Sequence, residues 1–182
     1  MKKGAILTAI ILFTIGSLYA LIRYISMQGF AFAWALNCLL MFSGLLFFEA
    51  LKSPLNGSYF KEQPWEGKGK IYESVGVNLF RKLLVLIGWE KLIRKGNPVE
   101  KNIKTLKHLH HQTKQSELSH LILLIIVFGF NIFVALKFGF LASIWLLILN
   151  ILMHLYPIFL QRYNRPRIER AINVSQWRSA SQ

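Results

Sequence analysis

The sequence predicts an all-α integral membrane protein with about four transmembrane helices and a cytoplasmic or interfacial helical loop region. Three observations lead to this fold class. Hydrophobic residues make up 54% of the 182 residues and charged residues only 16%, whereas globular domains carry about 25% charged residues. The charges are mostly cationic, with 22 Lys and Arg against 8 acidic residues and a formal net charge of +14. Four apolar stretches are long enough to cross about 30 Å of hydrocarbon.

The four expected spans cover residues 4–22, 30–50, 118–136 and 138–160. Lys2 and Lys3 precede the first stretch as they would in a signal peptide, but no small-x-small cleavage site follows before Arg23. We therefore expect a retained first span. Pro157 is expected to kink the fourth span.

Lys and Arg are distributed unevenly between the segments that connect the spans. The segment Leu51–Leu118 carries 13 of them, the tail from Gln161 carries 5 and the N-terminus 2, whereas the two short turns carry one each. Because cytoplasmic connections are enriched in Lys and Arg, both termini and the middle loop are expected on the cytoplasmic side of the cell membrane. The chain then forms a single membrane domain, 1–182, with a loop over about 51–117 and a basic tail over 161–182.

The middle loop contains an amphipathic stretch, Asn78–Ile93, in which apolar residues such as Leu79 and Trp89 alternate with Arg81 and Lys82. It is too short to span a bilayer. We expect a helix there that lies on the anionic headgroups of the inner leaflet.

Several classes of protein and site are not expected. The cations lie between the spans rather than on a polar domain, so nucleic-acid binding is not predicted. Cys38 is the single cysteine and cannot form an internal disulfide. Glu117 and His120 spell half of a di-iron motif, but no second E-x-x-H exists, so no metal is expected. Nucleophile elbow, P-loop and dinucleotide motifs are absent, and no bound cofactor is expected.

Glu117 and His120 are the candidate catalytic residues. On a helix they share one narrow stripe with Thr113 and can form a hydrogen bond where the helix enters the membrane. Ionisable groups at that depth are costly and favour a functional role. A histidine can remove a proton from a hydroxyl while a carboxylate orients its ring. The alternative is that both side chains reach the headgroups and do nothing more.

A second polar cluster directly follows the fourth span. Guanidinium groups bind phosphate or carboxylate with two hydrogen bonds, so the cluster is a candidate binding site for substrate or anion, and the alternative is a simple cationic anchor. Pro166 is expected to end the helix near Arg165. His154, four residues after Asn150 in the fourth span, is added to the site, although such residues often only join helices. The candidate binding residues are Gln161, Arg162, Tyr163, Asn164, Arg165, Arg167 and His154.

These two clusters resemble the glycosyl-4,4′-diaponeurosporenoate acyltransferases, small membrane proteins of bacterial carotenoid biosynthesis. Residues 161–167, Q-R-Y-N-R-P-R, match that family's motif at every position, and Gln112–His120 is similar to its E-T-[KR]-x-A-E-x-x-H stretch. A looser likeness begins near Tyr59, so the resemblance covers about Tyr59–Arg170. It implies that a fatty acyl group is esterified to a sugar hydroxyl of a glycosylated C30 carotenoid acid.

The sequence thus favours a membrane acyltransferase in which both clusters meet in one site. His120 would be the general base, Glu117 would orient it, the arginines would hold an anionic group, and Asn164 or Tyr163 would stabilise the oxyanion. The co-substrate would be acyl-CoA or an acyl carrier protein, and the partners would be the glycosylated carotenoid or a membrane lipid. Two alternatives remain: a non-enzymatic membrane subunit that binds headgroups or scaffolds a complex, and methyl transfer to a lipid.

Overall fold

The computed structural model describes residues 2–51, 54–89 and 102–180, and these residues form helices and no strand. The longer helices are α1 (Lys2–Tyr24), α2 (Phe30–Leu51), α4 (Val77–Leu86), α6 (Ile103–Phe138), α7 (Phe140–Asn150) and α8 (Tyr156–Ala180). The short elements are η1 (Ser58–Phe60), η2 (Pro64–Glu66), α3 (Ile71–Ser74) and the π-helical turn η3 (Ile151–Leu155). The all-α class is confirmed.

Among the residues that the structure describes, four helical stretches are long and apolar enough to span a membrane: Lys3–Tyr24, Phe30–Leu51, Ile103–Phe138 and Phe140–Arg178. The first two agree closely with the expected spans. The third helix begins at Ile103 rather than near 118, and helix continues beyond 160 to Ala180. Part of the expected loop and most of the expected tail are therefore helical, in keeping with the Lys, Leu and Gln residues of 103–117, which favour helix.

The expectation that the helix ends near Pro166 is wrong, because α8 continues through this proline. A proline inside a helix removes one backbone hydrogen bond and crowds the preceding turn. Here the side chain of Arg165 is held by the Phe60 carbonyl and by the Thr113 hydroxyl. Arg165 thus makes these tertiary contacts while its backbone is helical, although the residue before a proline usually avoids the helical conformation.

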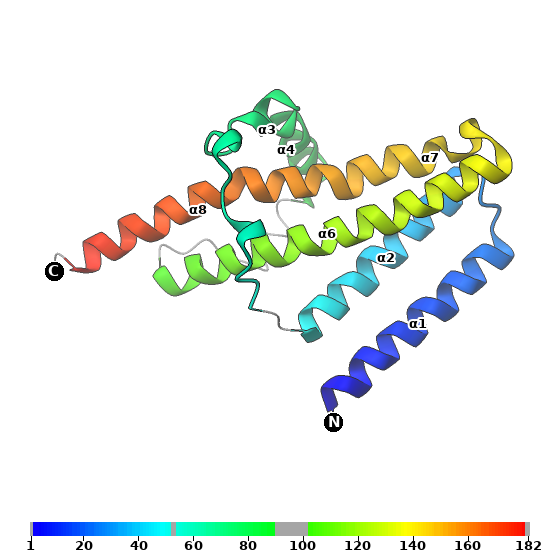
Figure 1. Cartoon of the computed structure of the whole chain (residues 1–182), viewed down its shortest axis with the longest axis horizontal. Helices are drawn as coiled ribbons and strands as arrows, with labels where there is room; N and C mark the ends of the chain where they lie inside the picture. The colour runs from blue at the N-terminus through cyan, green and yellow to red at the C-terminus, as the bar shows by residue number, and fades with distance from the viewer. Residues whose placement is uncertain (1, 52–53, 90–101, 181–182) are drawn as a thin grey trace. The chain divides into compact units, whose positions relative to one another are not determined.

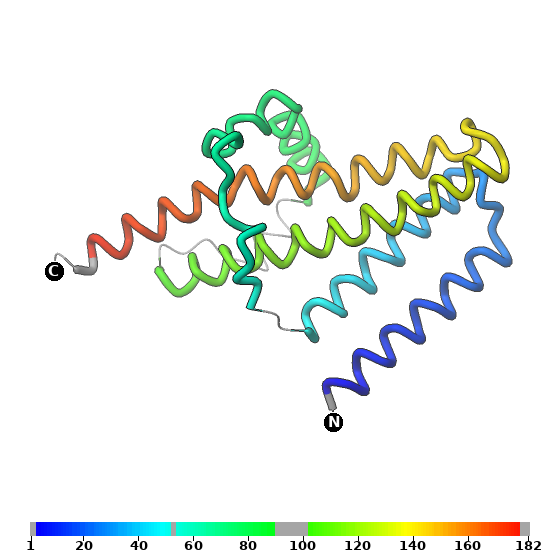
Figure 2. Tube along the Cα trace, viewed as in Figure 1, coloured from blue at the N-terminus to red at the C-terminus, as the bar shows by residue number. Residues whose placement is uncertain are grey.

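The chain forms two compact units, and Figures 1 and 2 trace their helices. The first unit consists of Met1–Pro54 and Leu118–Pro157. Its core is apolar and includes Phe32 and Leu36 of α2 and Val127 of α6, all without exposed surface. Gly44 allows α2 to approach α6 closely, since a Cβ there would lie 3.2 Å from the Ser119 hydroxyl oxygen.

Within the first unit, α6 and the chain from α7 to η3 pack antiparallel in a fixed register. The Asn131 amide donates to the Ser143 carbonyl (2.8 Å) and the Asn150 amide donates to the Leu124 carbonyl (3.1 Å). Gly139, with φ +93°, makes the turn between the two helices. The π-helical turn η3 ends two residues before Pro157, which lies in the first turn of α8.

The second unit consists of Leu55–Glu117 and Ile158–Gln182. Its small core joins Tyr72 of α3, Val77 of α4 and Tyr163 of α8. The expected helix over 78–93 is observed as α4, which ends at Leu86 before Gly88 takes a φ of +75°. Residues 90–93 lie outside the described residues. The apolar side chains of Leu79 and Leu86 are 73% and 83% exposed.

Candidate functional site

The candidate site of the second unit is built around Arg162, the first arginine of α8. Its Nε donates to Glu117 Oε1 (2.6 Å), and one terminal nitrogen donates to Glu66 Oε1 (2.8 Å). The other terminal nitrogen donates to the Tyr59 carbonyl (3.0 Å), and the guanidinium lies 4.6 Å from the centre of the Tyr59 ring. Arg162 therefore joins two carboxylates that are far apart in the sequence.

Arg165, one turn further along α8, binds the second oxygen of the same carboxylate. It donates to Glu117 Oε2, to the Phe60 carbonyl (3.1 Å) and to the Thr113 hydroxyl oxygen (3.3 Å). The side chain of Glu117 has no exposed surface, and that of Arg165 is 4% exposed. A buried carboxylate is stable only when it is paired and hydrogen-bonded, and two guanidinium groups meet that need here.

Glu66 is the second carboxylate of the network. Its carboxylate accepts a hydrogen bond from the Tyr72 hydroxyl (2.5 Å) and another from the Gln63 backbone N–H (2.7 Å). Burial raises the pKa of Glu66, but hydrogen bonds from Tyr72 and Arg162 outweigh it and hold the pKa below its ordinary value. Burial, followed by the hydrogen bond to Glu66, raises the pKa of Tyr72 well above its ordinary value. Both effects favour an ionised carboxylate beside a neutral phenol.

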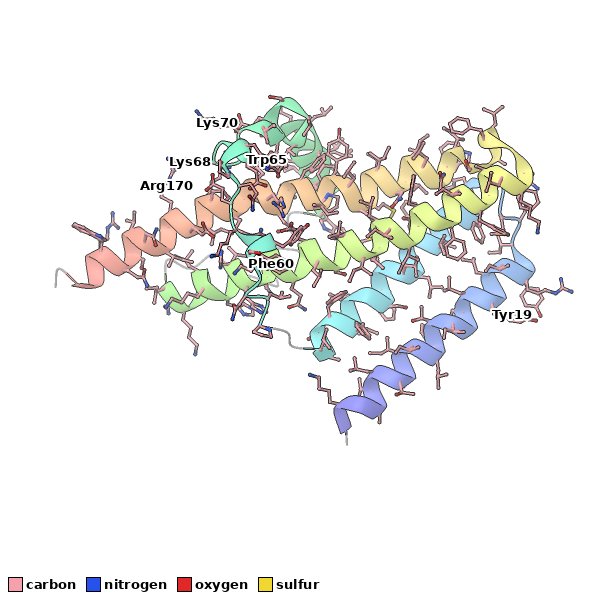
Figure 3. The ribbon with its side chains drawn as sticks, in the orientation of Figure 1. Tyr19, Phe60, Trp65, Lys68, Lys70 and Arg170 are labelled. Atoms are coloured by element: carbon pink, nitrogen blue, oxygen red, sulfur yellow. The ribbon has the colours of Figure 1, made fainter. Side chains whose placement is uncertain are left out.

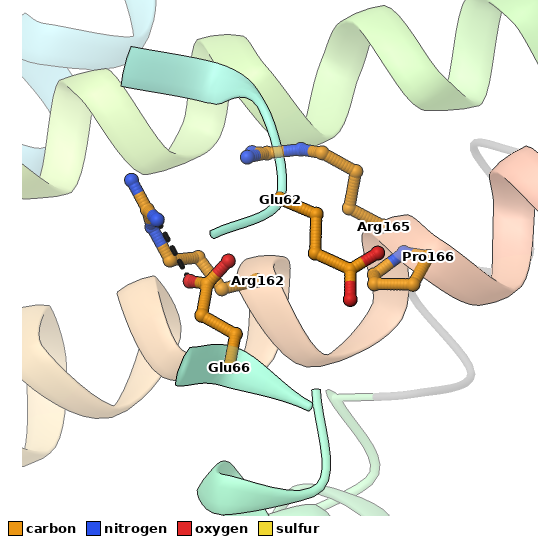
Figure 4. A pocket seen from close by; sticks show the side chains of 5 residues that line it. All are labelled: Glu62, Glu66, Arg162, Arg165 and Pro166. Atoms are coloured by element: carbon orange, nitrogen blue, oxygen red, sulfur yellow. Dashed lines mark hydrogen bonds and ion pairs between the residues drawn. The ribbon is translucent and has the colours of Figure 1, made fainter. Parts of the chain in front are cut away.

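A small pocket opens beside this network, lined by Glu62, Glu66, Arg162, Arg165 and Pro166 (Figure 4). It holds two carboxylates and two guanidinium groups, so its formal charge is balanced. Glu62 is fixed at the pocket because its Oε1 accepts a hydrogen bond from the Lys68 backbone N–H (2.7 Å). The pocket therefore offers both donors and acceptors of hydrogen bonds.

Arg167 binds to its own helix and to α3. It donates to the Tyr163 carbonyl (2.5 Å) and to Glu73 (3.2 Å), and its guanidinium lies 3.6 Å from the centre of the Tyr163 ring. Gly69 packs against the backbone of Tyr163, because a Cβ at Gly69 would lie 3.1 Å from the Tyr163 carbonyl oxygen. The φ of Gly69 is +85°. Tyr163 therefore packs the core of the second unit.

The other polar candidates of α8 have lesser roles in the network. The Gln161 amide donates to the Ser116 hydroxyl oxygen (3.2 Å) of α6. Asn164 is half-buried, and its side chain makes no hydrogen bond to the residues that the structure describes. On the outside of this unit, Trp65, Lys68 and Lys70 project from the segment that carries η2 (Figure 3).

His120 and His154 form a separate pair in the first unit. Their Nδ1 atoms are 3.3 Å apart, and the rings are tilted by 50°. His154 is completely buried, whereas His120 is half-buried. Glu117 and His120 do not share the hydrogen bond that their spacing predicts: among the described side chains, Glu117 binds arginines and His120 binds His154.

Sequence reasoning missed Glu66 and Tyr72, which complete the charge network. The only sequence signal for them is the loose family likeness of the loop that begins near Tyr59. Thr113 was placed beside Glu117 in the helical stripe, and the structure finds both in contact with Arg165. Within the described ranges, no group of three or more His, Cys, Asp or Glu residues is arranged to hold a metal ion.

Comparison with known proteins identifies a family. Residues 56–174 match the family model described as glycosyl-4,4′-diaponeurosporenoate acyltransferase. The matched range contains the whole network around Glu117 and both members of the histidine pair. No curated protein and no solved structure matches the chain.

Proposed function

The chain belongs to the glycosyl-4,4′-diaponeurosporenoate acyltransferase family, and we propose that it transfers a fatty acyl group to a sugar hydroxyl of a glycosylated C30 carotenoid acid or a similar glycolipid. The observation that carries the proposal is the family match, which spans both polar clusters. Four helices of membrane-spanning length suit an enzyme whose substrates are lipids.

The proposed reaction is a direct transfer between two substrates. The acceptor hydroxyl oxygen attacks the carbonyl carbon of a thioester, supplied by acyl-CoA or an acyl carrier protein. The new C–O bond forms as the C–S bond breaks, and the hydroxyl proton passes to His120 and then to the leaving thiolate. Histidine suits this step because the unprotonated nitrogen of a neutral imidazole can accept the proton of a hydroxyl group.

We place a polar part of the sugar at the pocket beside Arg162 and Arg165. An anion there would meet the carboxylates of Glu62 and Glu66, which line the same pocket. A sugar hydroxyl is neutral and both donates and accepts hydrogen bonds, so it suits a charge-balanced lining. The guanidinium N–H groups that are not used by Glu117, Glu66, Thr113 and the backbone carbonyls would serve this contact.

Asn164 is the candidate for stabilising the tetrahedral oxyanion. Its amide N–H groups are not used by hydrogen bonds within the described residues, and amide donors are suited to this role. Tyr163 is the weaker candidate because its side chain is buried in the core of the second unit and its ring lies against the Arg167 guanidinium.

The experiment uses the purified full chain in lipid nanodiscs with a labelled acyl thioester and a glycosylated carotenoid acid. His120→Ala is expected to lower the rate by about 10²-fold or more, because a general base contributes that much. His108→Ala is the matched control, since His108 is exposed. Full transfer by a normally expressed His120→Ala variant would show that the mechanism is wrong.

The same assay identifies the donor. Acyl-CoA and acyl carrier protein are supplied in turn, and product formed with only one of them assigns the co-substrate. A labelled S-adenosylmethionine control separates acyl transfer from methyl transfer. Consumption of the methyl donor instead of the thioester would overturn the proposed reaction.

We also propose that α4 lies on the anionic headgroups of the inner leaflet. Its exposed apolar residues, Leu79 and Leu86, accompany the exposed Arg81 and Lys82, a composition typical of interfacial helices. A nitroxide attached at Leu86→Cys, in a Cys38→Ala background, should be more accessible to oxygen than to a water-soluble nickel chelate. A label at Arg81→Cys, which lies on a different face of the helix from Leu86, should show the opposite preference, and equal accessibility at both positions would contradict the proposal.

A further inference from the structure

His154 lies at the end of a row of polar contacts between α6 and the chain from α7 to η3. Asn131 pairs with Ser143, Leu124 with Asn150, and His120 with His154. From one pair to the next, the residue number falls along α6 by as much as it rises along the segment from α7 to η3, as antiparallel packing requires. The histidine pair therefore belongs to the regular register of the first unit.

The contact of His154 differs in kind from the others in this row. Asn131 and Asn150 donate to backbone carbonyls, which is what residues that join membrane helices do. His154 instead contacts the imidazole of His120, at 3.3 Å between the two Nδ1 atoms. Only one of these nitrogens can carry the shared hydrogen, so each ring sets the tautomer of the other.

The two rings also differ in access. His154 has no exposed surface and lies in the π-helical turn η3, an element that often occurs at functional sites. His120 is half-buried, so it is the member of the pair that a substrate can reach.

We propose that His154 is a positioning residue for His120 in acyl transfer, an inference that rests on the proposed function. His120 Nδ1–H donates to His154 Nδ1, which leaves His120 Nε2 without a hydrogen and free to take the proton of the acceptor hydroxyl. The imidazolium that forms keeps its Nδ1–H on His154 until Nε2 returns the proton to the leaving thiolate. Glu117 is not the observed partner of this ring, because among the described side chains it binds Arg162 and Arg165, whereas His120 binds His154.

The contact between His120 and His154 can be explained without a third titratable side chain. At this level of the first unit, α2 contributes Ser43 and Gly44, and Gly44 lies against Ser119, the neighbour of His120. Neither residue titrates. The Ser43 hydroxyl and His154 Nε2 are buried without a hydrogen-bond partner in the described residues.

The test compares His154→Leu, which removes the hydrogen bond, with His154→Asn, whose amide can restore it to Nδ1. The matched control is Asn150→Leu, which removes a buried polar contact one turn away without touching His120. Transfer rates are measured against pH in nanodiscs. His154→Leu should lower kcat about tenfold or more with little change in KM and should shift the acid limb of the profile. His154→Asn should restore most of kcat, and Asn150→Leu should leave the profile unchanged.

A second measurement does not depend on activity. In ¹⁵N-histidine spectra, with His120 assigned from a His120→Ala sample, the wild-type chain should show one neutral tautomer with hydrogen on Nδ1. His154→Leu should return His120 to a mixture of tautomers. Wild-type kcat in His154→Leu, failure of His154→Asn to rescue, or an unchanged His120 spectrum in His154→Leu would each overturn the inference. A wild-type chain that transfers no acyl group would instead defeat the proposed function, and the spectra would still test His154.

Discussion

At the scale of single residues, Glu117 is the centre of the charge network. Its carboxylate has no exposed surface and is shared by the guanidinium groups of Arg162 and Arg165. Glu66 supplies a second carboxylate to Arg162, so the four buried charges balance. Removing one member of such a network leaves another charge buried without compensation, and this is more costly than any single ion pair on a surface.

Glu117→Gln is therefore expected to destabilise the chain by about 3–5 kcal/mol, seen as a lower thermal midpoint in detergent. The matched control is Glu169→Gln, which breaks the more exposed pair with His110 (2.8 Å) and should cost less than about 1 kcal/mol. Equal losses in the two variants would show that Glu117 is not held as a buried, paired charge.

The lowered pKa of Glu66 predicts how the stability of the folded chain depends on pH. Its pKa is lower in the folded chain than its ordinary value of 4.5, so the folded state binds its proton less readily than the unfolded state. The stabilisation by Glu66 is then complete above pH 4.5 and is lost as the pH falls through the lower, folded value. Acid should lower the thermal midpoint of the wild-type chain more steeply than that of Glu66→Gln. Parallel curves would contradict this assignment.

At the scale of elements, Gly69 determines how closely the chain between η2 and α3 approaches α8. A Cβ there would come within 3.1 Å of the Tyr163 carbonyl oxygen and 3.2 Å of its Cα. These are backbone atoms and cannot move aside as a flexible side chain could. The φ of +85° adds a conformation that residues with a Cβ rarely adopt.

Gly69→Ala should therefore destabilise the second unit by about 1–3 kcal/mol through strain and lost contact with α8. Gly57→Ala is the control, because Gly57 has a φ of −63° and no atom within 4 Å of its added Cβ. Limited proteolysis between Leu55 and Leu86 should be faster in Gly69→Ala alone. Unchanged proteolysis would mean that the approach of Gly69 to α8 is not needed.

The helix α8 shows why the element boundaries were only partly predictable. Composition correctly indicated the apolar helices, since 20 or so apolar residues have few other stable states in lipid. The local preference of Pro166 pointed to a helix end, yet the helix continues to Ala180. Local rules see only neighbours in the sequence, whereas Arg165 is held by Phe60 and Thr113, which are distant in the sequence.

At the scale of the whole molecule, the expected topology places both termini and the segment between α2 and α6 on the cytoplasmic side. In a Cys38→Ala background, single cysteines at Lys61 and Arg178 should react with an impermeant maleimide only in inside-out vesicles. A cysteine at Ser26, between α1 and α2, should react from the outside of intact cells. Labelling of Lys61 and Arg178 from opposite faces would refute the two spans expected between them.

The sequence predicted several residues of the candidate site but not all of the contacts between them. Glu117, Arg162 and Arg165 were identified from residue type and spacing, and the structure brings these three together. The hydrogen-bond partner of His120 was predicted as Glu117, because both lie on one helical stripe, but its observed partner is His154. Spacing along a helix shows which side chains are able to meet, and competition from residues on another helix is invisible to it.

Composition and order along the chain alone determined the all-α class, the four apolar helices and the polar residues at their ends, because the cost of placing polar groups in lipid depends on local composition. Only the tertiary structure decided which charged side chains pair with one another and that the His120 imidazole contacts the His154 imidazole. Those pairings depend on packing between segments that are 34 to 96 residues apart, and no local preference carries that information.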